Sequence, residues 1–267
     1  MRLQDRVGLV TGAASGIGRA IALSLARRGC HVALADRDAA GLAETAALLP
    51  AGVRVSLHVL DVSDAAAIAA LPAKIMAEHG RIDLLVNNAG VAIGGTFEQV
   101  SAEDFDWLFA INFHAVVRLT RAFLPLLKAS DDARLVNISS LFGLIAPPGQ
   151  TAYVASKFAV RGFSESLRHE LAATPVGVTV VHPGGVATAI ARNARPPVGV
   201  DPAMAEKERV SFEAFLKMPP AEAGETIVKG VERRKPRIVV GNDAKFAALI
   251  ERIAPVGYWS ILSRGRT

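Results

Sequence analysis

Two kinds of segment alternate along the chain. The shorter kind consists of continuous runs rich in Val, Leu and Ile, namely VGLVTG, HVALAD, RVSLHVLD, IDLLVNN, RLVNISS, VTVVHPG and RIVVG. Such runs are typical of strands that are buried on both faces, as in a parallel sheet. Between them lie longer helical patterns, for example at residues 19–28, 39–49, 65–79, 103–128 and 152–173. The alternation predicts a doubly wound α/β fold, with seven mostly parallel strands and helices on both faces of the sheet.

Local signals mark the ends of several elements. The sequence SAED at 101–104 is a capping box that opens a helix, and Pro220 suits the first turn of another. Residues 189–217 interrupt the alternation with three prolines and a charged stretch, which predicts an inserted loop with a short helix. Residues 242–267 extend the chain past the last strand. Because the sequence contains no internal repeat or low-complexity linker, we expect residues 1–267 to form a single domain.

Composition excludes several kinds of site. With one cysteine among 267 residues, the chain cannot form an internal disulfide or the usual structural zinc sites, and we expect Cys30 to be a buried, inert thiol. No His, Asp or Glu cluster has metal-ligand spacing, so we expect no metal, and His114, His169 and His182 to be structural. The N-terminus lacks a signal-peptide pattern and no apolar stretch approaches the ~20 residues that span a bilayer, which predicts a cytoplasmic protein.

The net charge of +5 is concentrated near the C-terminus. From residue 227 onward there are nine Lys and Arg against three Asp and Glu. A basic segment could attract an acidic partner or membrane headgroups, but a solvated helix end and terminus explain it more simply. Because the basic residues lack interleaved aromatic side chains or a known motif, we expect no nucleic-acid partner.

Glycines punctuate the passage from the first strand to the first helix. Gly12, Gly16 and Gly18 in TGAASGIG allow a tight turn, and the following helix offers unpaired N–H groups to a pyrophosphate. Asp36 closes the second strand 18 residues past the last of them, where a carboxylate binds the adenosine ribose and repels a 2′-phosphate. Arg37 could receive a 2′-phosphate if it swung inward, whereas Ser15 offers no basic clamp. The turn predicts a dinucleotide site that prefers NAD, with NADP as the alternative.

A phenol and an amine lie four residues apart in QTAYVASKFAV at 150–160. In a helix, Tyr153 and Lys157 would share one face, and an ammonium beside a phenol lowers the pKa of the phenol. A phenol can act as the base in alcohol oxidation near neutral pH only if its pKa is lowered from its usual value near 10. Pairs with this spacing are also common by chance on amphipathic helices, so the pair gains weight only from its context.

Six motifs in register supply that context. They are TGAASGIG at 11–18, NNAG at 87–90, a helical Asn112, NISS at 137–140, YVASK at 153–157 and PGGVAT at 183–188. With them the sequence resembles the classical short-chain dehydrogenase/reductase family over nearly its whole length. The resemblance implies a Rossmann-type fold and the NAD(P)-dependent oxidation or reduction of an alcohol or carbonyl.

The resemblance also implies roles for particular residues. Tyr153 would be the acid/base, Lys157 would tune it and bind the nicotinamide ribose, and Ser140 would hold the substrate oxygen. Asn112 would hold a water that links Lys157 to solvent, and Ser139, the rival of Ser140, should be turned away by strand alternation. The residues expected to line the cofactor groove are Gly12, Ser15, Gly16, Ile17, Gly18, Asp36, Arg37, Asp61, Val62, Asn88, Ala89, Gly90, Tyr153, Lys157, Pro183, Gly184, Val186 and Thr188.

We expect an apolar substrate site and a homo-oligomer. Leu141, Phe142, Leu144 and Ile145 should build one wall together with the insertion, and Gln150 offers a polar handle. Such a pocket favours a lipophilic secondary alcohol or ketone. The family's usual dimerising surface falls on the helices at 103–128 and 152–173, which implies a homodimer or homotetramer. We expect the C-terminal extension to pack within that oligomer.

Two other functions fit parts of the sequence. An NADPH-dependent 3-oxoacyl reductase would use Arg37 for the 2′-phosphate and the basic C-terminal segment for an acidic carrier. A non-catalytic dinucleotide sensor would be expected to have lost Ser140, Tyr153 or Lys157, and all three are present. The sequence therefore favours an oxidoreductase.

Overall fold

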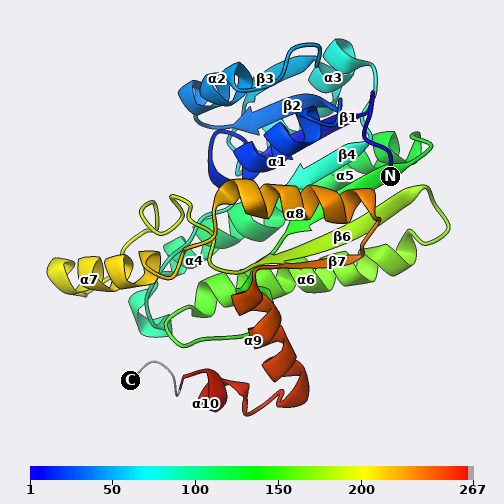
Figure 1. The fold of residues 1–267 in the computed structure, drawn as a ribbon. Helices are drawn as coiled ribbons and strands as arrows, with labels where there is room; N and C mark the ends of the chain where they lie inside the picture. The colour runs from blue at the N-terminus through cyan, green and yellow to red at the C-terminus, as the bar shows by residue number, and fades with distance from the viewer. Residues whose placement is uncertain (264–267) are drawn as a thin grey trace.

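The computed structural model describes residues 1–263, and at its centre is a seven-stranded sheet (Figure 1). The strands are β1 (Val7–Thr11), β2 (His31–Asp36), β3 (Val55–Val59), β4 (Leu84–Asn87), β5 (Ala133–Ile138), β6 (Val176–Pro183) and β7 (Arg237–Val240). They lie in the order β3-β2-β1-β4-β5-β6-β7, and every neighbouring pair is parallel. The predicted doubly wound fold is confirmed. Its strand order reverses between β1 and β4, where such sheets bind ligands at their carboxyl ends.

Helices cover both faces of the sheet, and alternate strand residues face different helices. Val10 of β1 lies in a core with Ile21 and Ile227, whereas Leu9 lies in a second core with Ile75 and Phe123. The helices are α1 (Gly16–Ala26), α2 (Ala39–Ala47), α3 (Ala65–His79), α4 (Ala102–Phe109), α5 (Ala115–Lys128), α6 (Thr151–Glu170), α7 (Pro202–Glu213), α8 (Pro220–Glu232), α9 (Asn242–Ile253) and α10 (Tyr258–Leu262). The two buried faces explain why the strand sequences are continuously apolar.

The helix predicted at 103–128 is interrupted in the structure. A π-helical turn, η2 (Ala110–His114), separates α4 from α5. Such a turn adds a residue to the helical hydrogen-bond ladder and is frequent at functional sites. The apolar periodicity does not reveal it, because the chain stays helical throughout. Both predicted helix N-termini are confirmed. Ser101 Oγ accepts the Asp104 N–H at 3.1 Å, and α8 begins at Pro220.

Two segments lie beyond the repeating pattern. The insertion contains α7, which extends to the left of the sheet in Figure 1, and the C-terminal extension forms α9 and α10 below it. Arg264 and Arg266 of the basic segment lie outside the described residues. No helix among residues 1–263 is long and apolar enough to cross a membrane. Cys30 is fully buried, which raises the pKa of its thiol to about 12, so this cysteine is inert as predicted.

Candidate active site

The turn between β1 and α1 is shaped by its glycines. Gly12 and Gly16 have φ values of +66° and +54°, in the left-handed region that favours glycine. A Cβ on Gly18 would lie 2.0 Å from the Gly12 carbonyl oxygen. Ser15 is the extended N-cap of α1 and its side chain makes no capping hydrogen bond, so the first N–H groups of α1 are left for an anion. Ile17 follows, half-buried against the core. These residues fit the pyrophosphate of a dinucleotide.

Thr11 ties this turn to the neighbouring strand β4. Its Oγ1 accepts the N–H groups of Asn88 at 3.0 Å and Ala89 at 3.1 Å. The Asn88 side chain donates back to the Thr11 carbonyl at 2.9 Å. The predicted groove residues Gly12, Asn88 and Ala89 are thereby held together where the strand order reverses. Sequence reasoning missed Thr11, although it stands in the same motif as Gly12.

Acidic side chains lie where β2 and β3 end. Asp36 accepts the Ala14 N–H at 3.1 Å and the Asp38 N–H at 3.1 Å, so its carboxylate is fixed beside the glycine turn. The pKa of Asp61 is lowered, mainly by hydrogen bonds from Ser63 and in part by the positive charge of Arg37. Arg37 is exposed at this end of the groove, and Val62 is buried beside Asp61.

Tyr153 and Lys157 lie one turn apart on α6, close to the end of β5. Lys157 is buried, its Nζ donates to the Ile138 carbonyl at 3.3 Å, and it lies 5.5 Å from the centre of the Tyr153 ring. Ser140 lies just past β5, and its side chain acts to lower the pKa of the Tyr153 hydroxyl. Ser139 is turned away as expected, because its Oγ donates to the Lys157 carbonyl at 2.8 Å. The structure thus brings Ser140, Tyr153 and Lys157 into one cluster.

Burial dominates the protonation of this cluster. It raises the pKa of Tyr153 to about 12, while the side chain of Ser140 acts in the opposite direction. Burial also lowers the pKa of the Lys157 ammonium to about 8. The expectation that Lys157 would lower the pKa of Tyr153 below its usual value is therefore wrong for the protein's own groups, because desolvation raises this pKa more than Ser140 lowers it.

Asn112 occupies the π-helical turn and holds the chain after β4. Its Oδ1 accepts the Val91 N–H at 2.9 Å, and its Nδ2 donates to the Val91 carbonyl at 3.0 Å and to Ser156 Oγ at 3.2 Å. A Cβ on Gly90 would lie 3.2 Å from Asn112 Oδ1 and 3.5 Å from Lys157 Nζ. Asn112, Gly90 and Lys157 are therefore close together, and a side chain at residue 90 would crowd the lysine.

The loop at 183–188 follows β6 and meets the glycine turn. Pro183 is the last residue of β6, Gly184 is half-buried and Val186 is buried. A Cβ on Gly16 would lie 3.1 Å from Thr188 Cγ2, which places Thr188 against the start of α1. The loop therefore lies against the glycine turn at the start of α1.

The insertion makes aromatic contacts at two places on the domain. The Phe142 ring lies 6.1 Å from that of Tyr153 and 6.5 Å from that of Phe212 on α7. Farther along the chain, the Arg195 guanidinium stacks 3.6 Å from the centre of the Trp107 ring on α4. The insertion is thus bound both to α4 and to the segment after Ser140.

The predicted substrate wall needs a correction. Leu144 and Ile145 are only 1% and 5% exposed, so they pack inside the fold and do not present a surface to the cleft. Leu141 and Phe142 lie in the short helix η3 (Leu141–Gly143) and are half-buried, as is Gln150. The short helix is the reason for the difference, because it turns the following residues inward.

His182 is a neighbour of this cluster that sequence reasoning treated only as structural. It is fully buried, and its Nδ1 hydrogen-bonds the Ser140 carbonyl at 2.9 Å, so Nδ1 carries the proton. Burial lowers the pKa of His182 to about 4, which keeps the ring neutral. His182 therefore links the end of β6 to the backbone of Ser140. Within residues 1–263, no group of three or more His, Cys, Asp or Glu could hold a metal ion.

Comparison with known proteins identifies the family. The family model for short chain dehydrogenases matches residues 6–199. The Mycobacterium tuberculosis protein SadH, which is named as an oxidoreductase, is 43% identical over 266 residues, which cover 98% of this chain and 95% of SadH. The chain therefore belongs to the short-chain dehydrogenase/reductase family.

Solved structures agree with this assignment. A short-chain dehydrogenase/reductase from Burkholderia phymatum in complex with NAD matches with a TM-score of 0.87 and 30% identity, over 94% of each chain. A metagenomic short-chain oxidoreductase in complex with NADP matches with a TM-score of 0.69 and 32% identity, over 90% of this chain and 98% of its own. The protein is accordingly an oxidoreductase of a family whose members bind NAD or NADP.

Proposed function

We propose that this enzyme transfers a hydride between NAD and a lipophilic secondary alcohol or ketone. The observation that supports this most strongly is the cluster at the end of β5, where Lys157 is buried 5.5 Å from the centre of the Tyr153 ring and Ser140 influences the Tyr153 hydroxyl. A bound nicotinamide would supply the hydride chemistry, so the protein has a proton to move and an oxygen to hold.

In the oxidation direction, Tyr153 removes the substrate hydroxyl proton while Ser140 hydrogen-bonds the same oxygen and stabilises its developing charge. Tyr153 must enter this step as the phenolate, which the Lys157 ammonium stabilises, and it leaves the step as the phenol. Lys157 would also bind the nicotinamide ribose. Asn112 anchors the neighbouring backbone and holds a water through which Lys157 exchanges a proton with solvent. In reduction the same groups act in reverse. No step in this scheme needs a metal.

The proposed NAD preference rests on the carboxylate of Asp36. It is held beside the glycine turn by the N–H groups of Ala14 and Asp38, where it would accept from ribose hydroxyls and repel a 2′-phosphate. The positive charge of Arg37 acts on Asp61, on the adenosine side of the groove. Measuring kcat/KM with NADH and NADPH tests the preference, and a tenfold advantage for NADPH would overturn it.

The proposed substrate class follows from the side chains that lie near the Ser140, Tyr153 and Lys157 cluster. The half-buried Leu141 and Phe142, together with Phe212 of the insertion, offer an apolar surface near Tyr153. We propose that this surface takes a lipophilic alcohol or ketone. A screen of alcohols and ketones that follows NADH absorbance tests the proposal. The absence of turnover on every substrate would favour the alternative function, a non-catalytic dinucleotide sensor.

Replacing Tyr153 by Phe removes the proposed acid/base and leaves the ring in place. We expect kcat to fall by about 10³-fold or more, because a positioned general acid/base typically contributes 10²–10⁴-fold. NAD binding should stay within about twofold of wild type, as measured by calorimetric titration. Turnover close to the wild-type rate would remove Tyr153 from the mechanism.

The 3-oxoacyl reductase remains the second candidate because Arg37 is exposed and could turn toward a 2′-phosphate. It predicts NADPH preference and turnover of carrier-bound 3-oxoacyl chains.

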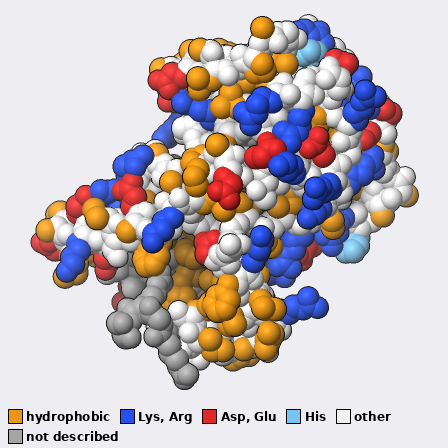
Figure 2. Space-filling view, in the orientation of Figure 1, with side chains coloured by type: hydrophobic (Ala, Val, Ile, Leu, Met, Phe, Trp, Pro, Cys, Tyr) orange, Lys and Arg blue, Asp and Glu red, His pale blue; other side chains and the backbone are white. Residues whose placement is uncertain are grey.

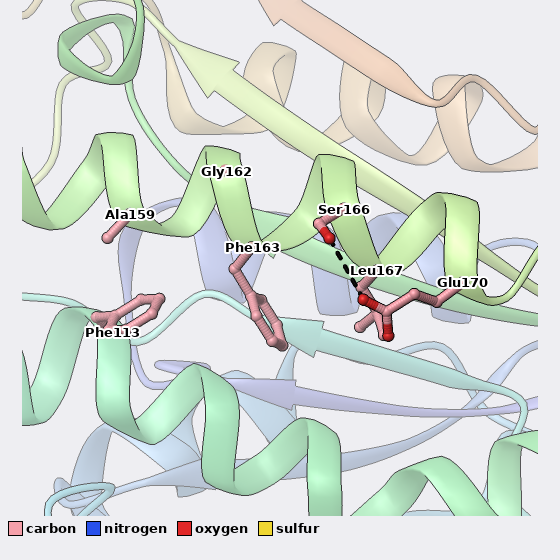
Figure 3. A pocket seen from close by; sticks show the side chains of 7 residues that line it. All are labelled: Phe113, Ala159, Gly162, Phe163, Ser166, Leu167 and Glu170. Atoms are coloured by element: carbon pink, nitrogen blue, oxygen red, sulfur yellow. Dashed lines mark hydrogen bonds between the residues drawn. The ribbon is translucent and has the colours of Figure 1, made fainter.

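We also propose that the enzyme forms a homo-oligomer through the outer face of α6. A hollow of about 390 Å³ lies there, lined by Phe113, Phe163 and Leu167 among others (Figure 3). The rings of Phe113 and Phe163 meet edge to face, with their centres 6.2 Å apart. This partly apolar hollow offers a surface against which a second copy could pack.

A further inference from the structure

The C-terminal extension contacts two walls of the proposed active site. At the start of α9, Asp243 Oδ2 accepts the Gly185 N–H at 2.7 Å. In α10, the Tyr258 hydroxyl accepts the Ala146 N–H at 2.9 Å. Gly185 belongs to the loop at 183–188, and Ala146 belongs to the segment that follows Ser140. One extension thus holds both the loop at 183–188 and the segment that follows Ser140.

The paired glycines of the loop show how closely it is enclosed. A Cβ on Gly184 would lie 2.2 Å from Asp243 Oδ2, and a Cβ on Gly185 would lie 2.3 Å from the Phe215 carbonyl oxygen. The backbone of Met218 pairs with the same loop, since its N–H donates to the Gly185 carbonyl at 2.9 Å. The loop is therefore enclosed between the C-terminal extension and the end of the insertion.

The backbone before α9 is shaped to present this carboxylate. Gly241 has a φ of +97°, and a Cβ on it would lie 2.3 Å from Asp243 Oδ1. Asp243 also lies in the first turn of α9, where the helix dipole favours a negative charge. Both features fix the side chain in the position from which it reaches Gly185.

We propose that Asp243 and Tyr258 are positioning residues: Asp243 holds the loop at 183–188 in its cofactor-binding position, and Tyr258 holds the end of the segment that carries Leu141 and Phe142 of the proposed substrate surface. This inference rests on the proposed function and on the family resemblance, which places Pro183, Gly184, Val186 and Thr188 of that loop in the cofactor groove. Neither side chain acts on the reacting atoms. Because the two residues hold different segments of the proposed site, their substitution should produce different effects. Asp243 governs affinity for NAD, and Tyr258 governs the KM for the alcohol or ketone.

Calorimetric titration with NAD tests Asp243 without any substrate. We expect Asp243→Ala to weaken NAD binding about fivefold to tenfold, because the loop loses a charge-assisted hydrogen bond. Asp243→Asn keeps an acceptor oxygen and should stay within about twofold of wild type. Lys245→Ala, on an exposed residue of the same helix, is the matched control and should not change binding. Unchanged affinity in Asp243→Ala, or an equal loss in Asp243→Asn, would overturn the assignment.

Steady-state kinetics of Tyr258→Phe test the other contact. The variant loses only a hydroxyl, so it should fold normally and bind NAD with wild-type affinity. We expect its substrate KM to rise about threefold to fivefold while kcat changes less, as the loss of one hydrogen bond predicts. An unchanged KM would overturn the role of Tyr258. If wild type binds NAD but turns over no alcohol or ketone, the proposed function fails, while the Asp243 titrations still give their own answer.

Discussion

At the scale of single residues, burial determines the protonation states of the side chains in the candidate site. Desolvation favours the neutral form of both Tyr153 and Lys157. It raises the pKa of Tyr153 to about 12 and lowers the pKa of Lys157 to about 8. Sequence reasoning predicted the pair but not these directions, because spacing along a helix says nothing about how deeply the helix is buried. His182 is a similar case: only the fold brings it to the Ser140 carbonyl.

A second buried group, away from the candidate site, should make stability depend on pH. Ser56 Oγ lies 2.7 Å from His58 Nε2 and 2.8 Å from His79 Nε2, and burial lowers the pKa of both histidines below the ordinary 6.5. Between pH 6.5 and the folded-state pKa values, the unfolded chain binds more protons than the native protein. The free energy of unfolding should therefore fall as the pH drops from 7 to 5.

Urea unfolding at pH 7 and pH 5 measures this change. His58→Gln and His79→Gln should each make the dependence shallower, whereas His169→Gln, at an exposed position on α6, should leave it unchanged. An equally steep dependence in the double variant of His58 and His79 would assign the effect to other groups, for example His182, whose pKa is lowered to about 4.

At the scale of helices and strands, close approach is set by small residues. α1 and α8 pack against each other where Gly224 faces Ala20. Just past the end of α1, Arg28 forms ion pairs with Glu225 at 2.8 Å and Glu232 at 2.9 Å on α8. The sequence predicted both helices but not their pairing. About two hundred residues separate them, and only the sheet order brings them together on one face.

Enlarging Gly224 should separate these two helices. A Cβ there would lie 2.7 Å from the Ala20 Cβ, so Gly224→Val should destabilise the protein by about 1–3 kcal/mol, the usual cost of overpacking. Denaturant unfolding measures the loss. Gly257→Ala is the control, since φ there is −91° and nothing lies within 4 Å of the added Cβ. Wild-type stability in Gly224→Val would show that α8 moves away from α1 at no cost.

At the scale of the whole molecule, two apolar regions are candidate interfaces for the proposed homo-oligomer. One is the α6 hollow described above. The other is the C-terminal extension, where Figure 2 shows hydrophobic side chains gathered at the bottom of the molecule. Phe246, Ile253 and Val256 are 58%, 72% and 95% exposed there. Exposed apolar area of this kind usually marks an interaction site.

We expect the α6 hollow to be the primary interface. Phe163→Glu places a charge in the hollow, so light scattering after size exclusion should show a shift of the oligomer toward monomer. Phe246→Ser on α9 is the matched substitution on the other surface, and it should weaken a tetramer while leaving the dimer. An oligomer that survives Phe163→Glu but dissociates with Phe246→Ser would assign assembly to the extension.

The sequence by itself determined the parallel sheet, the glycine turn, Asp36 at the end of β2 and the Tyr153–Lys157 pair. These features depend on local order: apolar runs form buried strands, glycines allow positive φ, and residues four apart share a helix face. Only the tertiary structure decided that Leu144 is buried, that Asn112 lies in a π turn, and that Asp243 and Tyr258 reach loops distant in sequence. Such contacts depend on which chain segments the fold brings together, and no local pattern encodes that.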